Sequence, residues 1–224
     1  MDYIKVLLPL LTFALAIIFV PYIERRKDSA KAKKIHGFLM TELQDESALI
    51  PDRLEKMARC LGNLKCIKEG KYERGPVKYV PRETALYFLK PAMDLSFDLF
   101  TRDQRDAMKS LVAQVSALEL YLNEIKSIGL PEDNVDKLID CCKRYLHTGA
   151  SALNTMRIVS GSSRAIRGED KYVIGGILLE YKISAKYEDL IIRRSCAVPG
   201  GEAASLMPSR TRRKAEHRER SRRR

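Results

Sequence analysis

Residues 108–159 read MKSLVAQVSALELYLNEIKSIGLPEDNVDKLIDCCKRYLHTGASALNTMRIV and carry two apolar stripes with helical spacing. The first stripe steps by alternating three and four positions through Met108, Leu111, Val115, Leu118, Leu122 and Ile125. The second stripe steps in the same way through Val135, Leu138, Cys142, Tyr145, Gly149, Ala152, Met156 and Val159. Because side chains at this spacing share one face of an α-helix, the pattern predicts two amphipathic helices.

The connection between the two stripes is short. Gly129 is suited to end the first helix and Pro131 to open the second. Two helices of similar length joined in this way predict a central antiparallel αα-hairpin, and the mean spacing favours shallow, coiled-coil-like crossing. Gly149 and Ala152 are small, so we expect another helix to approach closely there.

Helical signals continue before the hairpin. Thr101 and Gln104 match a capping box, which predicts that a helix begins after Thr101. A preceding helix is expected to open at Pro81, with Pro91 kinking or breaking it.

Three further segments complete the helical prediction. Residues 24–46 have helical spacing, and a separate helix is expected from 52 to 68, after Pro51. Residues 171–194 are ambiguous, since Gly175 and Gly176 disfavour a helix and the β-branched content suits strands. Apolar spacing favours the helix there.

The amino terminus is strongly apolar. Val6 to Ile23 is eighteen residues without a charge, and eleven of the fifteen residues from Val6 to Val20 are Leu, Ile, Val or Phe. Those eleven contribute roughly −3 to −7 kcal/mol towards bilayer insertion. Eighteen helical residues extend about 27 Å, close to the thickness of a bilayer core. The sequence predicts a single transmembrane helix, represented by Val6, Leu10, Phe13, Ile17 and Val20.

Two alternatives for this segment are less favoured. A cleaved signal peptide needs a small-residue cleavage site, and residues 21–26, PYIERR, contain none. A buried core helix would normally show a polar face, whereas this segment is apolar on all sides.

The net charge of +12 comes from two short segments. Residues 24–34 hold six bases and two acids, and residues 209–224 hold nine bases and two acids, so the rest of the chain is nearly neutral. The bases downstream of the apolar segment predict, by the positive-inside rule, an external amino terminus and a cytoplasmic body.

Both basic segments are candidates for binding an anionic partner. The candidate residues are Arg25, Arg26, Lys27, Arg210, Arg212, Arg213, Lys214, Arg222, Arg223 and Arg224. Anionic lipid is the favoured partner of the tail, and the alternatives are a solvated terminus with no dedicated ligand and nucleic acid. Nucleic acid is disfavoured because residues 209–224 contain no aromatic side chain for base stacking. The Pro-, Gly-, Ser- and Arg-rich composition predicts that residues 196–224 are disordered.

No catalytic, metal or cofactor site is expected. No GxSxG, HExxH or GxGxxG motif occurs. The five cysteines include no CxxC pair and are interpreted as reduced thiols. His147 is interpreted as a surface residue, and Gly161 to Arg164 as an ordinary loop rather than an anion site.

The sequence thus predicts an all-α protein with four regions: a transmembrane anchor (1–23), a basic juxtamembrane helix (24–50), a helical bundle (51–195) and an Arg-rich tail (196–224). The predicted function is a non-enzymatic interaction or scaffold module at the inner or plasma membrane, with an unidentified protein partner. The alternative is a membrane tether that binds nucleic acid or anionic lipid through its tail. A third class, an enzyme with a dispersed site between the helices, is the least favoured.

Overall fold

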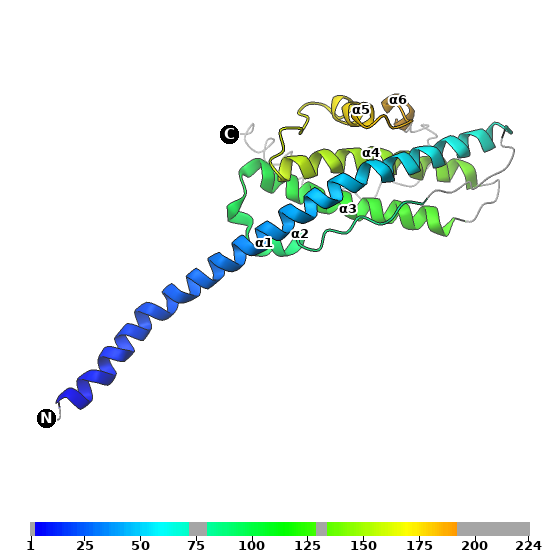
Figure 1. The fold of residues 1–224 in the computed structure, drawn as a ribbon. Coiled ribbons are helices and arrows are strands. Elements are labelled where there is room, and N and C mark those ends of the chain that lie inside the picture. The colour runs from blue at the N-terminus through cyan, green and yellow to red at the C-terminus, as the bar shows by residue number, and fades with distance from the viewer. Residues whose placement is uncertain (1–2, 72–79, 129–133, 192–224) are drawn as a thin grey trace, which may run out of the picture. The chain divides into compact units, whose positions relative to one another are not determined.

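The computed structural model describes residues 3–71, 80–128 and 134–191, and in these residues the chain is helical with no strand. Within the first helix, the side chains of residues 3–12, 14, 16 and 18 lie outside the description. The elements are α1 (Tyr3–Lys68), α2 (Leu89–Leu95), the 3₁₀ helix η1 (Phe97–Leu99), α3 (Arg102–Ser127), α4 (Val135–Val159), α5 (Asp170–Glu180) and α6 (Tyr187–Leu190). Figure 1 shows α1 and α3 beside α4, with α5 and α6 above α4.

The predicted hairpin is confirmed by α3 and α4. Three hydrogen bonds join the two helices: Gln104 Nε2 to the Val159 carbonyl, Gln114 Nε2 to Ser151 Oγ, and Cys141 Sγ to Glu124 Oε2. The partner numbers fall along α4 as they rise along α3, so the two helices run antiparallel. The predicted stripes supply their buried faces; Val115 alone is only partly buried.

The predicted capping box is present at the start of α3. Thr101 Oγ1 accepts a hydrogen bond from Gln104 N at 3.3 Å, and Gln104 Oε1 accepts one from Thr101 N at 2.9 Å. The amide nitrogen of the same glutamine donates to the Val159 carbonyl at the end of α4. One side chain therefore satisfies a free amide at the start of α3 and a free carbonyl at the end of α4.

Helix α1 also runs antiparallel to α4. The pairs along this contact are Leu54 with Gly149, Cys60 with Cys142, and Lys68 with Asp136. A Cβ built on Gly149 would lie 2.7 Å from Leu54 Cδ2 and 3.6 Å from Leu118 Cδ2. The close approach predicted at Gly149 is therefore confirmed, and α1, α3 and α4 meet at this point.

Helix α4 is the centre of the bundle. It contacts α1, α3, α5 and α6, and it is buried well beyond its predicted stripe, for example at Ile139, Leu146 and Leu153. A helix covered on several sides buries more than the single stripe of a surface helix. The periodicity predicted which residues face α3 but not how completely the other helices cover α4.

The prediction of a separate helix after Pro51 is wrong. Helix α1 continues through Pro51, so the division predicted between residues 50 and 51 falls inside one helix. An interior proline removes one hydrogen bond and costs about 3 kcal/mol. Ile50 and Leu54 are buried on either side of Pro51. Burying such side chains is worth about 1.5–3 kcal/mol each, which is enough to offset that cost.

The helix expected from Pro81 begins later, at Leu89. Pro91 lies in the first turn of α2, where its missing N–H is not needed. The carboxylate of Glu42 on α1 accepts hydrogen bonds from the backbone N–H groups of Tyr87 and Phe88, at 2.6 and 2.9 Å. A side chain from a distant helix therefore caps α2, which no local pattern reveals.

The helical reading of residues 171–194 is confirmed within the described residues by α5 and α6. Gly176 lies inside α5, where a Cβ would be 2.9 Å from Ile166 Cδ1. The glycine that weakens the helix therefore makes room for the segment that leads into it.

Where the structure describes side chains, no helix contains an apolar stretch long enough to cross a membrane. The predicted span from Val6 to Ile23 includes side chains outside the description, among them those of Val6 and Leu10. The predicted tail, residues 196–224, also lies outside the described residues.

Candidate functional site

The amino-terminal part of α1 extends beyond the other helices (Figure 1). Among the described side chains of α1, Ile35 and His36 make the first contacts with the bundle: Ile35 packs against the core, and the His36 ring lies 4.8 Å from the Phe100 ring. We call residues 24–34 the stalk. From Ile23 to Ile35 the helix rises by about 18 Å.

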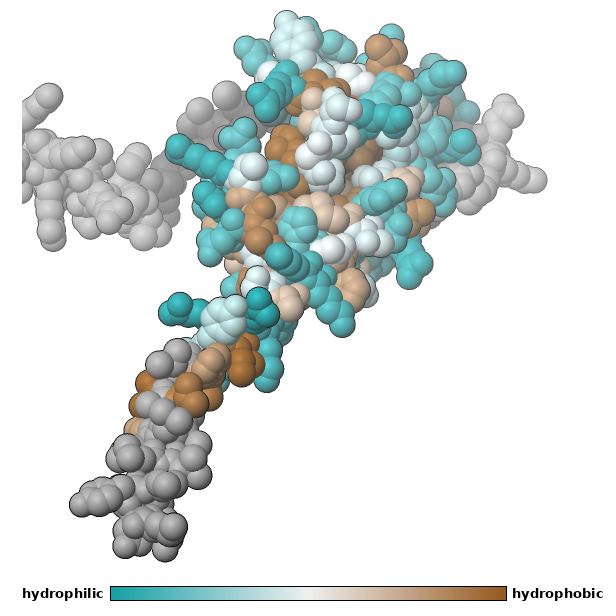
Figure 2. Space-filling model, turned by 60° about the vertical axis from the view of Figure 1, so that its left-hand side comes forward, coloured by the Kyte–Doolittle hydropathy of each residue, from teal (hydrophilic) through white to brown (hydrophobic). Residues whose placement is uncertain are grey.

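An apolar ring precedes the stalk. Its described members are Phe13, Leu15, Ile17, Phe19, Val20, Tyr22 and Ile23, each between 44 and 67 % exposed. At 3.6 residues per turn, these positions cover more than half of the helix circumference. Figure 2 shows this brown segment, followed by teal hydrophilic atoms towards the bundle. Phe13, Ile17 and Val20, three of the predicted membrane residues, therefore share an exposed apolar surface.

A basic collar occupies most of the stalk. It consists of Arg25, Arg26, Lys27, Lys31, Lys33 and Lys34, all exposed. The Arg26 guanidinium lies 5.1 Å from the centre of the Tyr22 ring, so it stacks on the edge of the apolar ring. The structure thus brings the three predicted bases Arg25, Arg26 and Lys27 directly beside the apolar ring.

The collar differs from the bundle in its pairing. Among the described residues, the ten ion pairs all lie between Glu46 and Asp189, and none includes a collar residue. The collar bases therefore have no carboxylate partner in the described part of the chain. The tail candidates lie outside that part: Arg210, Arg212, Arg213, Lys214, Arg222, Arg223 and Arg224.

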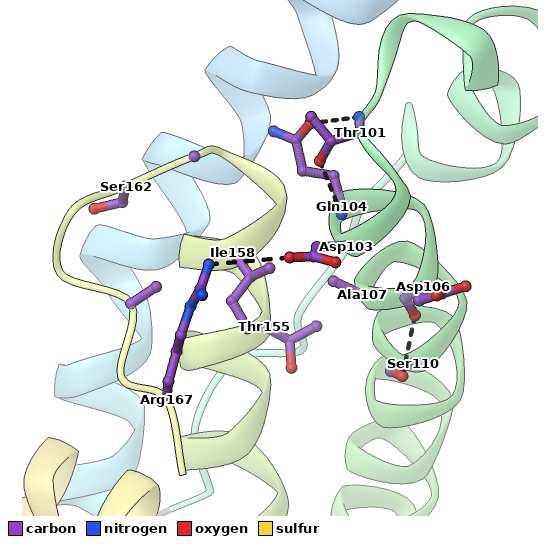
Figure 3. A pocket seen from close by; sticks show the side chains of 12 residues that line it. Thr101, Asp103, Gln104, Asp106, Ala107, Ser110, Thr155, Ile158, Ser162 and Arg167 are labelled. Atoms are coloured by element: carbon purple, nitrogen blue, oxygen red, sulfur yellow. Dashed lines mark hydrogen bonds and ion pairs between the residues drawn. The ribbon is translucent and has the colours of Figure 1, made fainter.

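The bundle has a cleft of about 630 Å³ between the start of α3 and the end of α4 (Figure 3). Asp103 and Arg167 form its rim as an exposed pair, 3.9 Å apart. The Thr101 hydroxyl is held in the capping box, and the Thr155 hydroxyl donates to the Ser151 carbonyl. The Thr101 hydroxyl thus serves the start of α3, whereas the Thr155 hydroxyl is bonded within its own helix. No nucleophile is paired with a base among the residues that line the cleft.

The loop after α4 also borders this cleft. Gly161 N donates to the Ile158 carbonyl and Ser162 N to the Arg157 carbonyl, while Gly161 adopts a positive φ of 68°. These amides close the end of α4, so they do not point together at an anion. The backbone amides of Gly161 and Ser162 are therefore used in ending α4.

A second cleft of about 530 Å³ lies between α1 and residues 82–88. Its exposed apolar side chains are Phe38, Leu49 and Tyr87, with Tyr87 79 % exposed. The Phe38 and Phe88 rings pack with their centres 5.0 Å apart. This cleft combines exposed aromatic and aliphatic groups, which are typical of protein contact surfaces.

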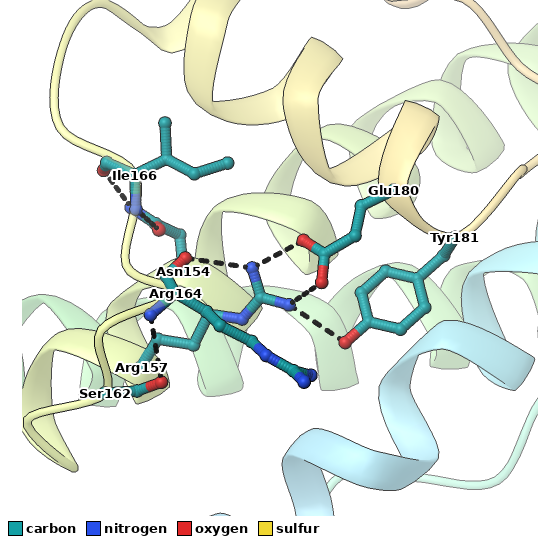
Figure 4. Close-up of polar contacts among 7 residues, drawn as sticks. All are labelled: Asn154, Arg157, Ser162, Arg164, Ile166, Glu180 and Tyr181. Carbon is teal, nitrogen blue, oxygen red and sulfur yellow. Dashed lines mark hydrogen bonds and ion pairs between the residues drawn. The ribbon is translucent and has the colours of Figure 1, made fainter.

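Sequence reasoning missed a buried polar network around Arg157 (Figure 4). The guanidinium donates to both Glu180 carboxylate oxygens at 2.8 Å, to the Tyr181 hydroxyl at 2.9 Å, and to the Arg164 carbonyl at 3.2 Å. Burial lowers the pKa of Arg157, but the hydrogen bonds that its guanidinium donates to Glu180 and Tyr181 outweigh this effect, so the pKa is raised. The network attaches α5 to the end of α4. A basic residue beside an apolar stripe was its only sequence signal.

The buried thiols are structural. Cys60 and Cys142 lie with their sulfur atoms 3.9 Å apart, and the Cys141 thiol donates to Glu124. Burial, reinforced by Glu124, raises the pKa of Cys141 to about 12, so its reactive thiolate form is disfavoured. In the described segments, no cluster of His, Cys, Asp and Glu could hold a metal ion. His147 is half-buried, with its ring 6.4 Å from that of Tyr187.

Comparison with protein-family models, curated proteins and solved structures finds no match to this chain. The candidate site is therefore defined by its own geometry: an apolar ring, a basic collar and a stalk that continues into a helical bundle.

Proposed function

We propose that the protein is a non-enzymatic scaffold held at the inner or plasma membrane by the amino-terminal part of α1. The bundle lies in the cytoplasm and contacts a protein partner at the same membrane. The observation that carries this proposal is the continuity of α1, which joins the apolar ring, the basic collar and the bundle in one helix.

The apolar ring supports the anchor. Burying a side chain such as Phe13 or Ile17 in an apolar phase is worth about 1.5–3 kcal/mol, and several such side chains are exposed in succession. A helix that is apolar on all sides is normally buried in a protein core or in lipid.

The stalk supports a scaffold role. A continuous helix would hold the bundle about 18 Å from the end of the apolar ring, measured from Ile23 to Ile35. Confinement to a surface raises the effective concentration of the bundle for partners on that surface. The cleft beside Leu49 and Tyr87 is the candidate contact surface, because it exposes apolar groups on the bundle.

Cross-linking of the full-length protein in native membranes tests the scaffold. The variants Leu49→Asp and Tyr87→Asp should lose the cross-linked partner that the unmodified chain captures. Leu179→Asp is the matched control, because Leu179 is 80 % exposed on α5, away from this cleft. If Leu179→Asp loses the same product, or if nothing is captured at native abundance, the scaffold proposal fails.

A reporter fused to the carboxyl end tests the orientation. Activity of a reporter that works only in the cytoplasm is expected. Activity of a reporter that works only outside the cytoplasm would place the bundle on the opposite side of the membrane.

A further inference from the structure

We propose that the collar binds anionic lipid headgroups, and that Arg25, Arg26 and Lys27 make this contact while Lys31, Lys33 and Lys34 do not. This inference rests on the proposed function, since it takes the apolar ring to lie in the bilayer. It adds the chemical class of the lipid and divides the collar into a binding and a non-binding half.

The collar carries positive charge that has no carboxylate partner in the described part of the chain. Ion pairs recur along the bundle, for example between Lys68 and Asp136 at 2.6 Å, whereas the described residues offer no such partner to any collar base. The acids nearby, Glu24 and Asp28, are too few to balance six bases. Lipid phosphates and carboxylates carry the complementary charge.

The two halves of the collar lie at different depths relative to the lipid headgroups. The headgroup layer on one side of a bilayer is roughly 5–7 Å thick. Arg25, Arg26 and Lys27 lie about 3–6 Å beyond Ile23 along the helix, whereas Lys31 to Lys34 lie about 12–17 Å beyond it. The first three bases are therefore level with the headgroups. The second three lie about 5–12 Å past the headgroups, a distance comparable to the screening length of about 8 Å at physiological salt, so their attraction to the headgroups is weaker.

Arg26 is placed to bind a lipid phosphate. Its guanidinium stacks on Tyr22, at the boundary between the apolar ring and the collar. Aromatic side chains favour the bilayer interface, and guanidinium groups form paired hydrogen bonds with phosphate. The stack therefore holds a phosphate-binding group at the depth where the first phosphates would lie.

The absence of tryptophan from the chain allows a direct test. The variant Tyr22→Trp gives the full-length protein a single fluorophore at this boundary. Tryptophan also preserves the stacking of Arg26. The protein is reconstituted into phosphatidylcholine vesicles in which about one lipid in five is brominated phosphatidylserine or, separately, brominated phosphatidylcholine.

The expected result is stronger quenching by the brominated anionic lipid. One base at the surface gives an anionic lipid roughly a fivefold advantage, which raises its local share from one fifth to about one half. Quenching should therefore favour the anionic lipid by about two- to threefold. The preference should disappear when Arg25, Arg26 and Lys27 are all replaced by Gln, and should persist when Lys31, Lys33 and Lys34 are replaced instead.

Three other outcomes would each overturn part of these proposals. Equal quenching by the two brominated lipids with the collar intact overturns the inference while leaving the anchor in place. Equal loss of preference in both triple variants overturns the division of the collar. If neither brominated lipid quenches the fluorescence, the apolar ring is not in the bilayer. The proposed function then fails together with the inference.

Discussion

The Arg157 network makes a quantitative prediction about stability. The Arg157 side chain is 6 % exposed and that of Glu180 is 35 % exposed, so the base is the more deeply buried partner. Replacing Glu180 with Ala leaves a buried guanidinium with only the Tyr181 hydroxyl and the Arg164 carbonyl as acceptors. We therefore expect Glu180→Ala to destabilise the bundle.

The magnitude follows from the burial. Removing one partner of a fully buried ion pair costs about 3–5 kcal/mol. Water reaches the Glu180 side of this pair, so we expect a smaller loss, about 2 kcal/mol. For a bundle of this size that corresponds to a fall in Tm of about 4–8 °C. Arg157→Met should cost less than Glu180→Ala, because methionine leaves no charge buried.

Thermal unfolding of the full-length protein in mild detergent, followed by far-UV circular dichroism, measures these losses. Asp106→Ala is the matched control, since it removes the exposed pair between Lys109 and Asp106. An exposed pair contributes about 0.2–1 kcal/mol at most. If Glu180→Ala and Asp106→Ala lower the Tm equally, or if Arg157→Met is the more harmful change, the reasoning about this network is refuted.

Two further predictions concern the core. Burial raises the pKa of Tyr145 from 10 to about 12. Between these pH values the folded chain keeps a proton that the unfolded chain releases. The stability is therefore intact below pH 10 and falls as the pH rises from 10 towards 12. The loss should be on the order of 2–3 kcal/mol and should be absent in Tyr145→Phe, measured by urea unfolding across that pH range. Gly149→Ala should lower the Tm despite the better helix propensity of alanine, because the new Cβ would lie 2.7 Å from the buried Leu54 side chain. Gly62→Ala in α1 is the control. Its new Cβ meets nothing within 4 Å, so this variant should raise the stability by about 1 kcal/mol. Equal effects of the two glycine variants would contradict the close packing at Gly149.

Local chemistry made part of the fold predictable. The capping box at Thr101 and the stripes of α3 and α4 depend on residues three and four positions apart, and the structure confirms them. The failures came from contacts distant in sequence. Glu42 caps α2 from another helix, and buried neighbours carry α1 through Pro51. No local pattern contains that information.

The candidate site was likewise only partly predictable from the sequence. The apolar ring and the collar are continuous runs in the sequence, so composition alone located them. That Arg25, Arg26 and Lys27 lack carboxylate partners in the described part of the chain required the structure. Arg157 has a partner 23 positions away in Glu180, and this spacing has no periodic signal.

The central claim is that the amino-terminal part of α1 is dissolved in lipid in the mature protein. Alkaline carbonate extraction of membranes that carry the full-length chain, with mass measurement of its amino terminus, tests this claim directly. We predict that the protein stays with the membrane pellet and retains the residues before Tyr22. Release into the carbonate wash, or a mature chain that begins after Tyr22, would contradict the account.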